Sequence, residues 1–336
     1  MQSKILDIGL HFPEKVYSNQ DLQQDFPNLK VKELTRLTGV LSRHICAGNE
    51  TSVDMGVLAA RQLFSQGKIQ KNNVDYLIFC STGGDFITPA SSSIVHEKLG
   101  LKPDCGTVDI NQGCTGFIHG MNLANGMIAA GGVENVLLIT SEAISKTIHS
   151  GDKGNRAIFG DAAAATLICK SEEKTDHGKF IFGTDGSKYD HIIIKHGRER
   201  FPLPESAESD FIDDFGTTRN NSKIYMNGSE VFNFSIGKAP ELIDSLLVNA
   251  NLQKDEIDFF VFHQSNRILL ETIGKKLKIP EEKIIFELET NGNTVSSSIP
   301  IALKRAEEKN QIKKGQKLLI AAFGVGFSWG GVIIEY

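Results

Sequence analysis

The sequence lacks a long apolar run and any closely spaced pair of cysteines. Its most apolar late stretch, residues 318–327, is too short and too rich in glycine to span a bilayer. The amino terminus has no apolar core of signal-peptide length. The five cysteines, at positions 46, 80, 105, 114 and 169, form an odd set without a C-x-x-C pair, which is typical of a reducing compartment. These features predict a cytoplasmic protein without a membrane span.

A basic excess is missing as well. The chain has 36 lysines and arginines against 41 aspartates and glutamates, a formal net charge of −5. A general nucleic-acid binder normally carries an excess of positive charge, so we expect no nucleic-acid partner. With 336 residues, of which 40% are hydrophobic and 23% charged, the chain is long enough for a large buried core. The usual size of domains predicts about two of them.

Short apolar or β-branched runs alternate with helical patterns along the whole chain, which is typical of α/β architecture. One helix is predicted over 53–64 behind a capping box of Thr51 and Asp54. A second is predicted to begin at Pro240 and to continue to residue 250, because proline suits the first turn of a helix. A third follows His263. The predicted strands are 76–80, 107–110, 136–140, 163–169, 259–263, 284–287, 318–322 and 331–335.

Two segments that lie 183 residues apart resemble each other. Residues 71–80 read Lys-Asn-Asn-Val-Asp-Tyr-Leu-Ile-Phe-Cys, and residues 254–263 read Lys-Asp-Glu-Ile-Asp-Phe-Phe-Val-Phe-His. A second echo pairs 137–139 with 318–320. A helix, a loop and a strand that match in step predict two similar halves, 1–175 and 176–336, each a sheet covered by helices.

The segment 198–221 differs from its surroundings. It contains two prolines and is predicted to be a solvated connecting loop; the alternative is a lid or a docking segment for a partner. It carries an acidic set between residues 205 and 214, namely Glu205, Glu208, Asp210, Asp213 and Asp214.

Cys114 is the cysteine that we expect to be reactive. It follows a predicted strand and precedes a helical stretch that ends near Ala130. The dipole at the amino end of a helix favours the thiolate, so this position predicts a lowered thiol pKa. The more common fate of a cysteine is inert burial, and the other four cysteines fit that interpretation.

His263 and Asn293 each follow a predicted strand, where ligands of α/β proteins bind. Taken alone, a histidine is more often structural, and an Asn-Gly-Asn tract is more often a turn. The glycine-rich segment 323–331 has the wrong spacing for a dinucleotide site. It is better suited to a tight turn that aims backbone N–H groups into a site.

Taken together, these motifs resemble β-ketoacyl-acyl-carrier-protein synthase III and its relatives. The segments that carry the resemblance are 112–117 (Gln-Gly-Cys-Thr-Gly-Phe), 159–164 (Phe-Gly-Asp-Ala-Ala-Ala), 261–266 (Val-Phe-His-Gln-Ser-Asn), 291–294 (Asn-Gly-Asn-Thr) and 322–330 (Ala-Phe-Gly-Val-Gly-Phe-Ser-Trp-Gly). The resemblance implies the thiolase fold, in which two similar halves, each a mixed sheet with helices, form α-β-α-β-α layers. It also implies a homodimer.

The resemblance further implies a decarboxylative Claisen condensation. Cys114 would take an acyl group from a thioester and then pass it to a malonyl or β-ketoacyl thioester. His263 and Asn293 would hydrogen-bond the carbonyl of that second thioester, and the backbone N–H groups of Cys114 and Val325 would form an oxyanion hole. No metal and no cofactor would be needed. The substrates would be acyl-CoA or acyl-ACP together with malonyl-ACP, so acyl carrier protein is an expected partner.

The same resemblance implies substrate-binding roles for six residues: Thr88, Lys153, Phe159, Met226, Phe232 and Arg267. Glu33 and Leu37 stand where relatives that use acetyl-CoA carry a tryptophan and an arginine, which favours a primer delivered by a carrier protein or in some other form. Thr88 replaces a bulkier phenylalanine and would leave room for a longer or branched acyl chain. Val325 replaces a glycine that is common in the family, and Arg267, the basic residue after the histidine motif, lies one position earlier than in relatives. These departures suggest a specialised fatty-acid, polyketide or secondary-metabolite pathway.

Three alternatives remain. A papain-like hydrolase also uses cysteine, histidine and asparagine, but its cysteine signature is missing here. An acyltransferase on the same fold could pass the acyl group from Cys114 to an amine or alcohol. A non-catalytic binding or scaffold subunit is disfavoured, because neither the nucleophile nor its partners are lost.

Overall fold

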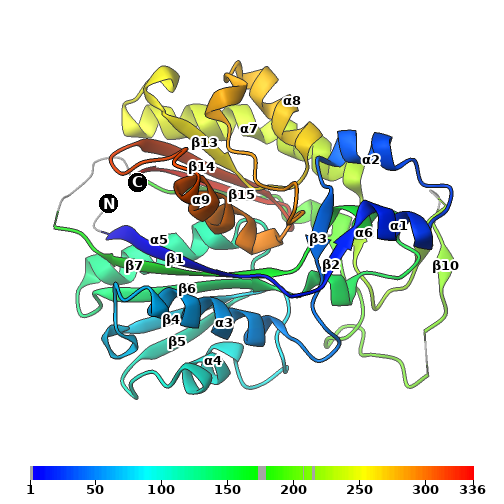
Figure 1. Ribbon diagram of the computed structural model, residues 1–336, viewed down its shortest axis with the longest axis horizontal. Coiled ribbons are helices and arrows are strands. Elements are labelled where there is room, and N and C mark those ends of the chain that lie inside the picture. Colours follow the sequence, from blue (N-terminus) through cyan, green and yellow to red (C-terminus); the bar gives the residue numbers. More distant parts are fainter. Residues whose placement is uncertain (1–2, 173–178, 207, 214–215) are drawn as a thin grey trace.

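The computed structural model describes residues 3–172, 179–206, 208–213 and 216–336. Figure 1 shows two sheets, with helices between them and on both outer faces. The strands are β1 (Ser3–His11), β2 (Val16–Ser18), β3 (Ser42–His44), β4 (Tyr76–Cys80), β5 (Gly106–Ile110), β6 (Asn135–Glu142), β7 (Ala162–Lys170), β8 (Ile181–Thr184), β9 (Ile192–Ile193), β10 (Phe211–Ile212), β11 (Thr218–Arg219), β12 (Tyr225–Met226), β13 (Phe259–Phe262), β14 (Lys317–Gly324) and β15 (Ser328–Glu335). The α-helices are α1 (Asn19–Asp25), α2 (Val31–Thr38), α3 (Ser52–Ser65), α4 (Ser91–Leu99), α5 (Gly116–Ala130), α6 (Lys153–Ile158), α7 (Gly228–Ala250), α8 (Arg267–Leu277) and α9 (Ser298–Glu308).

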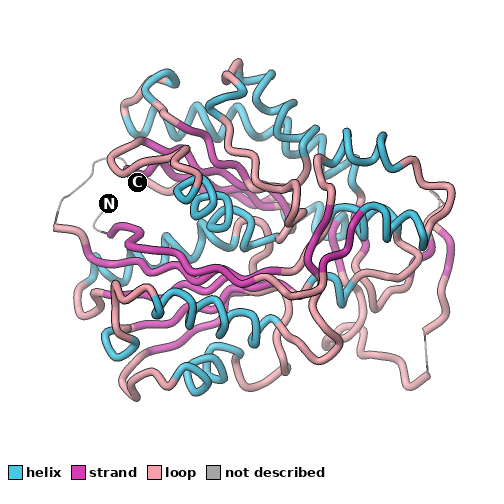
Figure 2. Tube along the Cα trace, viewed as in Figure 1, coloured by secondary structure: helices cyan, strands magenta, loops and turns pink. Residues whose placement is uncertain are grey.

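The two large sheets have the same plan. The first has the strand order β1-β7-β6-β4-β5, and the second has the order β13-β14-β15-β8. β4 runs parallel to β5 and β6, and β13 runs parallel to β14, whereas the remaining neighbours are antiparallel. Both sheets are therefore mixed, as the family resemblance implies, and Figure 2 shows them as two bands of strands with helices between.

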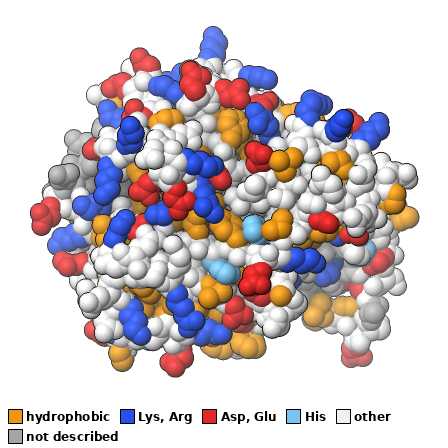
Figure 3. All heavy atoms as spheres, in the orientation of Figure 1, with side chains coloured by type: hydrophobic (Ala, Val, Ile, Leu, Met, Phe, Trp, Pro, Cys, Tyr) orange, Lys and Arg blue, Asp and Glu red, His pale blue; other side chains and the backbone are white. Residues whose placement is uncertain are grey.

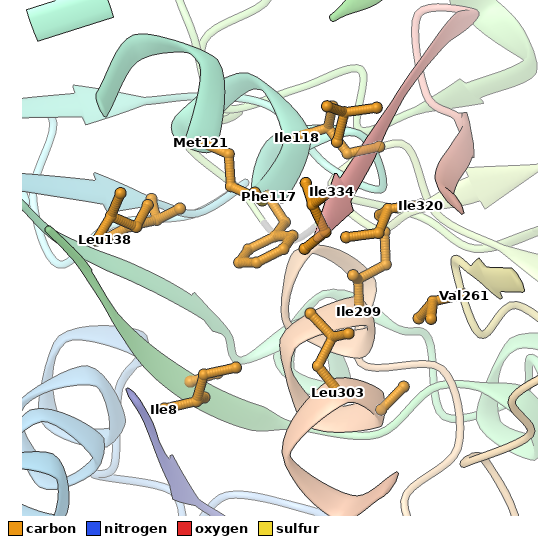
Figure 4. Packing of buried hydrophobic residues seen from close by; sticks show 14 of the residues in the cluster. Ile8, Phe117, Ile118, Met121, Leu138, Val261, Ile299, Leu303, Ile320 and Ile334 are labelled. Carbon is orange, nitrogen blue, oxygen red and sulfur yellow. The ribbon is translucent and has the colours of Figure 1, made fainter. Parts of the chain in front are cut away.

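Three hydrophobic clusters define the layers. The central cluster fills the space between the sheets with side chains of α5 and α9, and Figure 4 shows Phe117 and Ile118 facing Ile299 and Ile320 there. A second cluster packs α7 and α8 on the outer face of the second sheet, and a third packs α3 and α4 on the outer face of the first. The layers thus follow the predicted α-β-α-β-α order.

The strand pairing tests the internal repeat. η1 (Lys71–Asn73) with β4, and η4 (Lys254–Glu256) with β13, recur at the predicted spacing of 183 residues. In the ladders, Leu77 pairs with Leu137, whereas Phe260 pairs with Leu319. The counterpart of Leu137 is therefore Leu319, one residue later than the predicted echo. A shift of one residue exchanges the two faces of a strand. The second echo therefore pairs the correct two strands, but its register is wrong by one residue. The predicted boundary between residues 175 and 176 lies outside the described residues, and the two-domain division stays a prediction.

The predicted strand 284–287 is wrong. Only Ile284 forms an isolated parallel bridge, to Phe260. The backbone groups that follow hydrogen-bond the side chain of Gln264. Its amide nitrogen donates to the Ile285 carbonyl at 3.1 Å, and its amide oxygen accepts from the Glu287 N–H at 2.7 Å. A side chain thus replaces the ladder that a fifth strand would have formed.

The predicted start of a helix at Pro240 is also wrong. α7 begins at Gly228, where Asn227 caps it by accepting from the Glu230 N–H, and Pro240 lies inside it. Proline cannot donate to the carbonyl four residues earlier, here that of Ile236. The Lys276 ammonium donates to that carbonyl at 2.8 Å instead. The capping box of Thr51 and Asp54 and the helix after His263 are confirmed.

The predicted loop 198–221 contains the short ladder of β10 and β11. Arg219 forms ion pairs with Asp152 and Asp213, and His196 lies 3.3 Å from Glu208, so this segment is tied to the rest of the chain. Asp214 lies outside the described residues. On the face that Figure 3 shows, basic and acidic side chains are interspersed. Among the helices described, none is both long enough and apolar enough to cross a membrane.

Candidate active site

Cys114 lies in the turn between β5 and α5, two residues before the helix begins at Gly116. It is half-buried, whereas the other four cysteines are buried, and all five are free thiols. The backbone N–H groups of Val325 and of Cys114 itself hydrogen-bond the thiol. These two groups are the predicted oxyanion hole, and the structure brings them to the sulfur.

The predicted lowering of the Cys114 pKa is wrong for this structure. Burial raises the pKa of the thiol to about 12, and the two backbone N–H groups, which lower it, do not compensate. The charge of Glu142 raises the pKa further. Desolvation disfavours the thiolate more strongly here than the backbone N–H groups at the helix start favour it.

The last residue of β14 and the turn that follows it pack against this thiol. A Cβ at Gly324 would lie 2.5 Å from the Cys114 sulfur, so only glycine leaves room there. The Ser328 hydroxyl donates to the Val325 carbonyl at 2.7 Å and lies 3.0 Å from the hydroxyl of Thr115. The loop of the nucleophile and the turn of Val325 are therefore fastened to each other.

His263 is the first residue after β13 and is 5% exposed. Its backbone N–H donates to the Ala321 carbonyl at 2.9 Å, and its ring Nδ1 lies 2.7 Å from the hydroxyl of Ser298. Ser298 also accepts from the Gln264 N–H at 3.3 Å. Burial lowers the pKa of His263 to about 4, so the imidazole is neutral at physiological pH.

Asn293 is fixed by its own backbone and by its side-chain oxygen. Its N–H donates to the Ile158 carbonyl at 2.8 Å, and its carbonyl accepts from the Gly160 N–H at 3.1 Å. Its Oδ1 accepts from the Val295 N–H at 2.9 Å, so the amide nitrogen is the group left to act as a donor. Val295 adopts a φ of 51°, a strained value for a β-branched residue, in the turn that makes this hydrogen bond.

The three predicted catalytic residues line one cavity of about 550 Å³. Cys114, His263, Asn293 and Val325 line it together, so residues of both halves meet there. Its remaining wall is largely apolar, and three of the predicted substrate-binding residues, Phe159, Met226 and Phe232, belong to it. The other apolar residues of the wall are Ile144, Ile158, Ile192, Ile193, Ile194, Ile224, Val231, Leu269, Val295 and Phe323.

The structure does not bring the other three predicted substrate-binding residues to the cavity wall. Thr88 is exposed, as is Lys153 at the start of α6. Arg267 pairs with Glu271 at 2.6 Å and with Glu281 at 3.3 Å. Substrate-binding roles for these three residues stay predictions.

Sequence reasoning missed the polar residues that orient the site, namely Ser298, Thr115, Ser328, Thr82 and Glu142. The run of three serines at 296–298, directly after the Asn-Gly-Asn-Thr motif, was the available signal. Buried hydroxyls need partners, and a serine run at the end of a buried loop indicates that they find them. Within the described residues, no group of three His, Cys, Asp or Glu side chains could hold a metal ion.

Two similar mixed sheets in five layers, with a cavity to which both halves contribute, are the architecture of the thiolase-fold condensing enzymes. Solved structures agree with this class. A 3-oxoacyl-(acyl-carrier-protein) synthase III at 2.1 Å resolution superposes with a TM-score of 0.98 and 37% identity, and 100% of each chain is covered. The 3-oxoacyl-[acyl-carrier-protein] synthase III of Aquifex aeolicus superposes with a TM-score of 0.86 and 27% identity, over 99% of this chain and 100% of the other.

Sequence comparisons give the family. The family model described as 3-oxoacyl-[acyl-carrier-protein (ACP)] synthase III matches residues 108–186, and the model of the carboxy-terminal part of that enzyme matches residues 247–336. The β-ketoacyl-[acyl-carrier-protein] synthase III of Clostridium perfringens is 33% identical over 99% of both chains. A synthase III of Vibrio vulnificus is 31% identical over 100% of both. The chain belongs to the β-ketoacyl-acyl-carrier-protein synthase III family of condensing acyltransferases.

Proposed function

We propose that this chain condenses an acyl group, carried on Cys114, with a malonyl or β-ketoacyl thioester, and releases CO2 when the extender is malonyl. The observation that carries the proposal is that one cavity contains the half-buried thiol of Cys114, the neutral imidazole of His263 and the carboxamide of Asn293. The apolar wall of this cavity suits the acyl chain.

In the first step, the Cys114 sulfur attacks the carbonyl carbon of the acyl thioester. The new S–C bond forms as the old one breaks, and the Cys114 proton leaves with the departing thiol, so that atoms and charge balance. The N–H groups of Cys114 and Val325, which hydrogen-bond the sulfur here, are positioned to bind the carbonyl oxygen as it becomes an oxyanion.

In the second step, His263 and Asn293 act as hydrogen-bond donors. The Ser298 hydroxyl accepts from the Gln264 N–H, which leaves its own hydrogen for His263 Nδ1. We therefore assign the tautomer that carries its proton on Nε2, the nitrogen on the other side of the ring. That N–H and the Asn293 amide stabilise the enolate that forms as malonyl loses CO2. The enolate carbon then attacks the acyl-Cys114 carbonyl, and the departing thiolate of Cys114 takes up a proton.

The cavity favours an acyl chain longer than acetyl. A volume of about 550 Å³ lies within the range of pockets that enclose whole small-molecule ligands. Ile144, Phe159, Ile192, Ile224 and Met226 form one apolar cluster against Cys114, so a chain bound to the sulfur would lie among apolar side chains.

The remaining parts of the proposal come from the family and the sequence. The loss of CO2 supplies the carbanion, so no cofactor is required beyond the thioester substrates on CoA or acyl carrier protein. Acyl carrier protein is the proposed partner, the assembly is a homodimer, and the location is the cytoplasm. The halves 1–175 and 176–336 are the two proposed domains, and a specialised fatty-acid, polyketide or secondary-metabolite pathway is the proposed context.

The test is intact-mass spectrometry of the protein after incubation with acyl thioesters from acetyl to medium chain length, on CoA and on carrier protein. We expect an acyl adduct on Cys114, best with medium-chain donors, and no adduct in Cys114→Ala. Added malonyl-carrier protein should remove the adduct and release CO2. If amines or alcohols remove it and malonyl thioesters do not, the chain is an acyltransferase of the alternative kind. Unmodified protein with every donor would refute both.

A further inference from the structure

Glu142 is a buried carboxyl group beside the cavity that the reaction above does not use. It ends β6 and is 1% exposed. Its Oε2 accepts from the N–H of Thr82 at 3.1 Å and from its hydroxyl at 2.6 Å, and its Oε1 accepts from the Ser296 hydroxyl at 2.7 Å. Within the described residues, no lysine or arginine pairs with it. A buried carboxyl without a cation is costly to keep, so its place here requires a reason.

The two residues that donate to Glu142 stand on either side of the nucleophile's loop. Thr82 lines the cavity, and Ser296 follows Val295, which fixes Asn293. A Cβ built on Gly113, the residue before Cys114, would meet the side chains of Thr82 and Val295 at 3.5 Å each. Glu142 therefore links Thr82, in the first half, to Ser296, in the loop that follows Asn293 in the second half. The backbone of Gly113 and Cys114 lies between these two segments.

Glu142 also acts on the thiol through its charge. A negative charge nearby raises the pKa of Cys114, and burial raises the pKa of Glu142 itself to about 7. The other titratable groups around it are the Cys80 thiol, whose pKa burial also raises, and the carboxyl of Asp161. Lys146 and Asp85 line a smaller cavity of about 250 Å³ next to Glu142.

We propose that Glu142 is a positioning residue of the condensation site: its carboxyl group holds Thr82 and Ser296 around the nucleophile's loop, and its negative charge restrains the formation of the Cys114 thiolate. The inference rests on the proposed function in one respect, that Cys114 is the nucleophile. Protonation of Glu142, or its replacement by the isosteric amide of glutamine, removes the negative charge and relieves the electrostatic restraint. The amide also lacks one of the two acceptor oxygens, so it cannot accept hydrogen bonds from both Thr82 and Ser296 in the same way.

The test separates the two effects with Glu142→Gln. Alkylation of Cys114 by iodoacetamide, located by peptide mass spectrometry, reports the thiolate and needs no substrate. At about pH 8 we expect faster alkylation in the variant, because each unit by which a thiol pKa falls raises the thiolate fraction about tenfold. Condensation should instead slow by about tenfold or more, since donors around the reacting carbonyls lose their positions.

Two variants control for charge and for the substitution itself. Ser296→Ala removes one hydrogen bond but keeps the carboxylate, so it should slow condensation without accelerating alkylation. Glu134→Gln makes the same substitution just before the other end of β6, on a side chain that is 67% exposed, and should change neither rate. Thermal unfolding of each variant establishes that it is folded.

A measurement on the unaltered protein covers the case in which Glu142→Gln does not fold. The logarithm of the alkylation rate should rise with pH at unit slope and flatten around pH 7, where Glu142 ionises, before it rises again. A unit slope throughout, or unchanged alkylation in a folded Glu142→Gln, would overturn the inference. Failure of Cys114 to take any acyl group would instead refute the proposed function and leave these alkylation results interpretable.

Discussion

Replacement of Ser298 by alanine tests the assignment of the His263 tautomer. The Ser298 hydroxyl is the only side-chain group within the described residues that hydrogen-bonds His263, at 2.7 Å from Nδ1. Without it, Nδ1 has no acceptor or donor, and the imidazole no longer prefers the tautomer that directs an N–H from Nε2 into the cavity. The Gln264 N–H loses an acceptor at the same time.

The size of the effect follows from these contacts. A buried polar group left without a partner costs about 1 to 3 kcal/mol, and this loss falls on the arrangement that stabilises the enolate. We therefore expect malonyl decarboxylation by Ser298→Ala to slow by about 10- to 100-fold, which corresponds to about 1.4 to 2.7 kcal/mol in activation free energy. Acylation of Cys114, which does not use His263 as a donor, should change little.

The assay follows CO2 release from malonyl-carrier protein and, separately, acyl adduct formation by mass spectrometry. Ser297→Ala is the matched control, because its hydroxyl donates to the backbone carbonyls of Thr140 at 2.9 Å and Ala162 at 3.3 Å and does not contact His263. It should lower the free energy of unfolding by about 1 kcal/mol and leave decarboxylation within about twofold. Equal loss of decarboxylation in both variants would refute the assignment.

Three further predictions concern other parts of the structure. Gly324→Ala should abolish acylation, measured as adduct mass, because its Cβ would lie 2.5 Å from the Cys114 sulfur; normal acylation would contradict this. Lys276→Met should lower stability by about 1 kcal/mol in denaturant titrations, since the Ile236 carbonyl inside α7 loses its donor. Because the folded pKa of Glu142 is raised from 4.5 to about 7, its contribution to stability is full below pH 4.5 and is lost as pH rises through 7. The loss is about 3 kcal/mol in all, and denaturant titrations across this range should show a shallower decline in Glu142→Gln.

Most of the sheet framework could be predicted because its central strands, such as β6, β7 and β14, are continuous apolar runs buried on both faces. Along β14 the side chains of Leu318 and Ile320 enter the central cluster, and those of Leu319 and Ala321 enter the outer one. Such runs require no knowledge of their neighbours to be recognised. The predicted ends of these strands differ from the structure by at most a few residues, except at 284–287.

Two errors in the fold, the strand 284–287 and the helix start at Pro240, came from contacts between distant residues. The amide of Gln264 satisfies the backbone at 285–287, and the ammonium of Lys276 satisfies the carbonyl that Pro240 leaves free. Each contact overrides a local preference that would otherwise have produced a strand or a helix start. Neither can be found by periodicity, because the partners lie some 20 to 40 residues apart in the chain.

The candidate site was predictable in its members but not in its electrostatics. Cys114 and His263 follow β5 and β13, as predicted, and Asn293 lines the same cavity although the strand predicted before it is absent. The pKa of Cys114, however, depends on burial and on the charge of Glu142, which become known only from the packed structure. Phe159 and Met226 line the cavity, as the family resemblance implies, although an apolar side chain gives no sign of this in the sequence.

The similar plan of the two sheets gives two equivalent positions beside the site, and their residues differ. β6 and β14 have eight residues each and begin 182 positions apart, at Asn135 and Lys317, so that Glu142 corresponds to Gly324. By the same count Ser296 corresponds to Cys114. At one position the Cys114 sulfur packs against Gly324, where a Cβ would lie 2.5 Å from it; at the other the Ser296 hydroxyl donates to the Glu142 carboxylate. Equivalent positions of the two sheets thus leave room for the nucleophile in one case and form a buried hydrogen bond in the other.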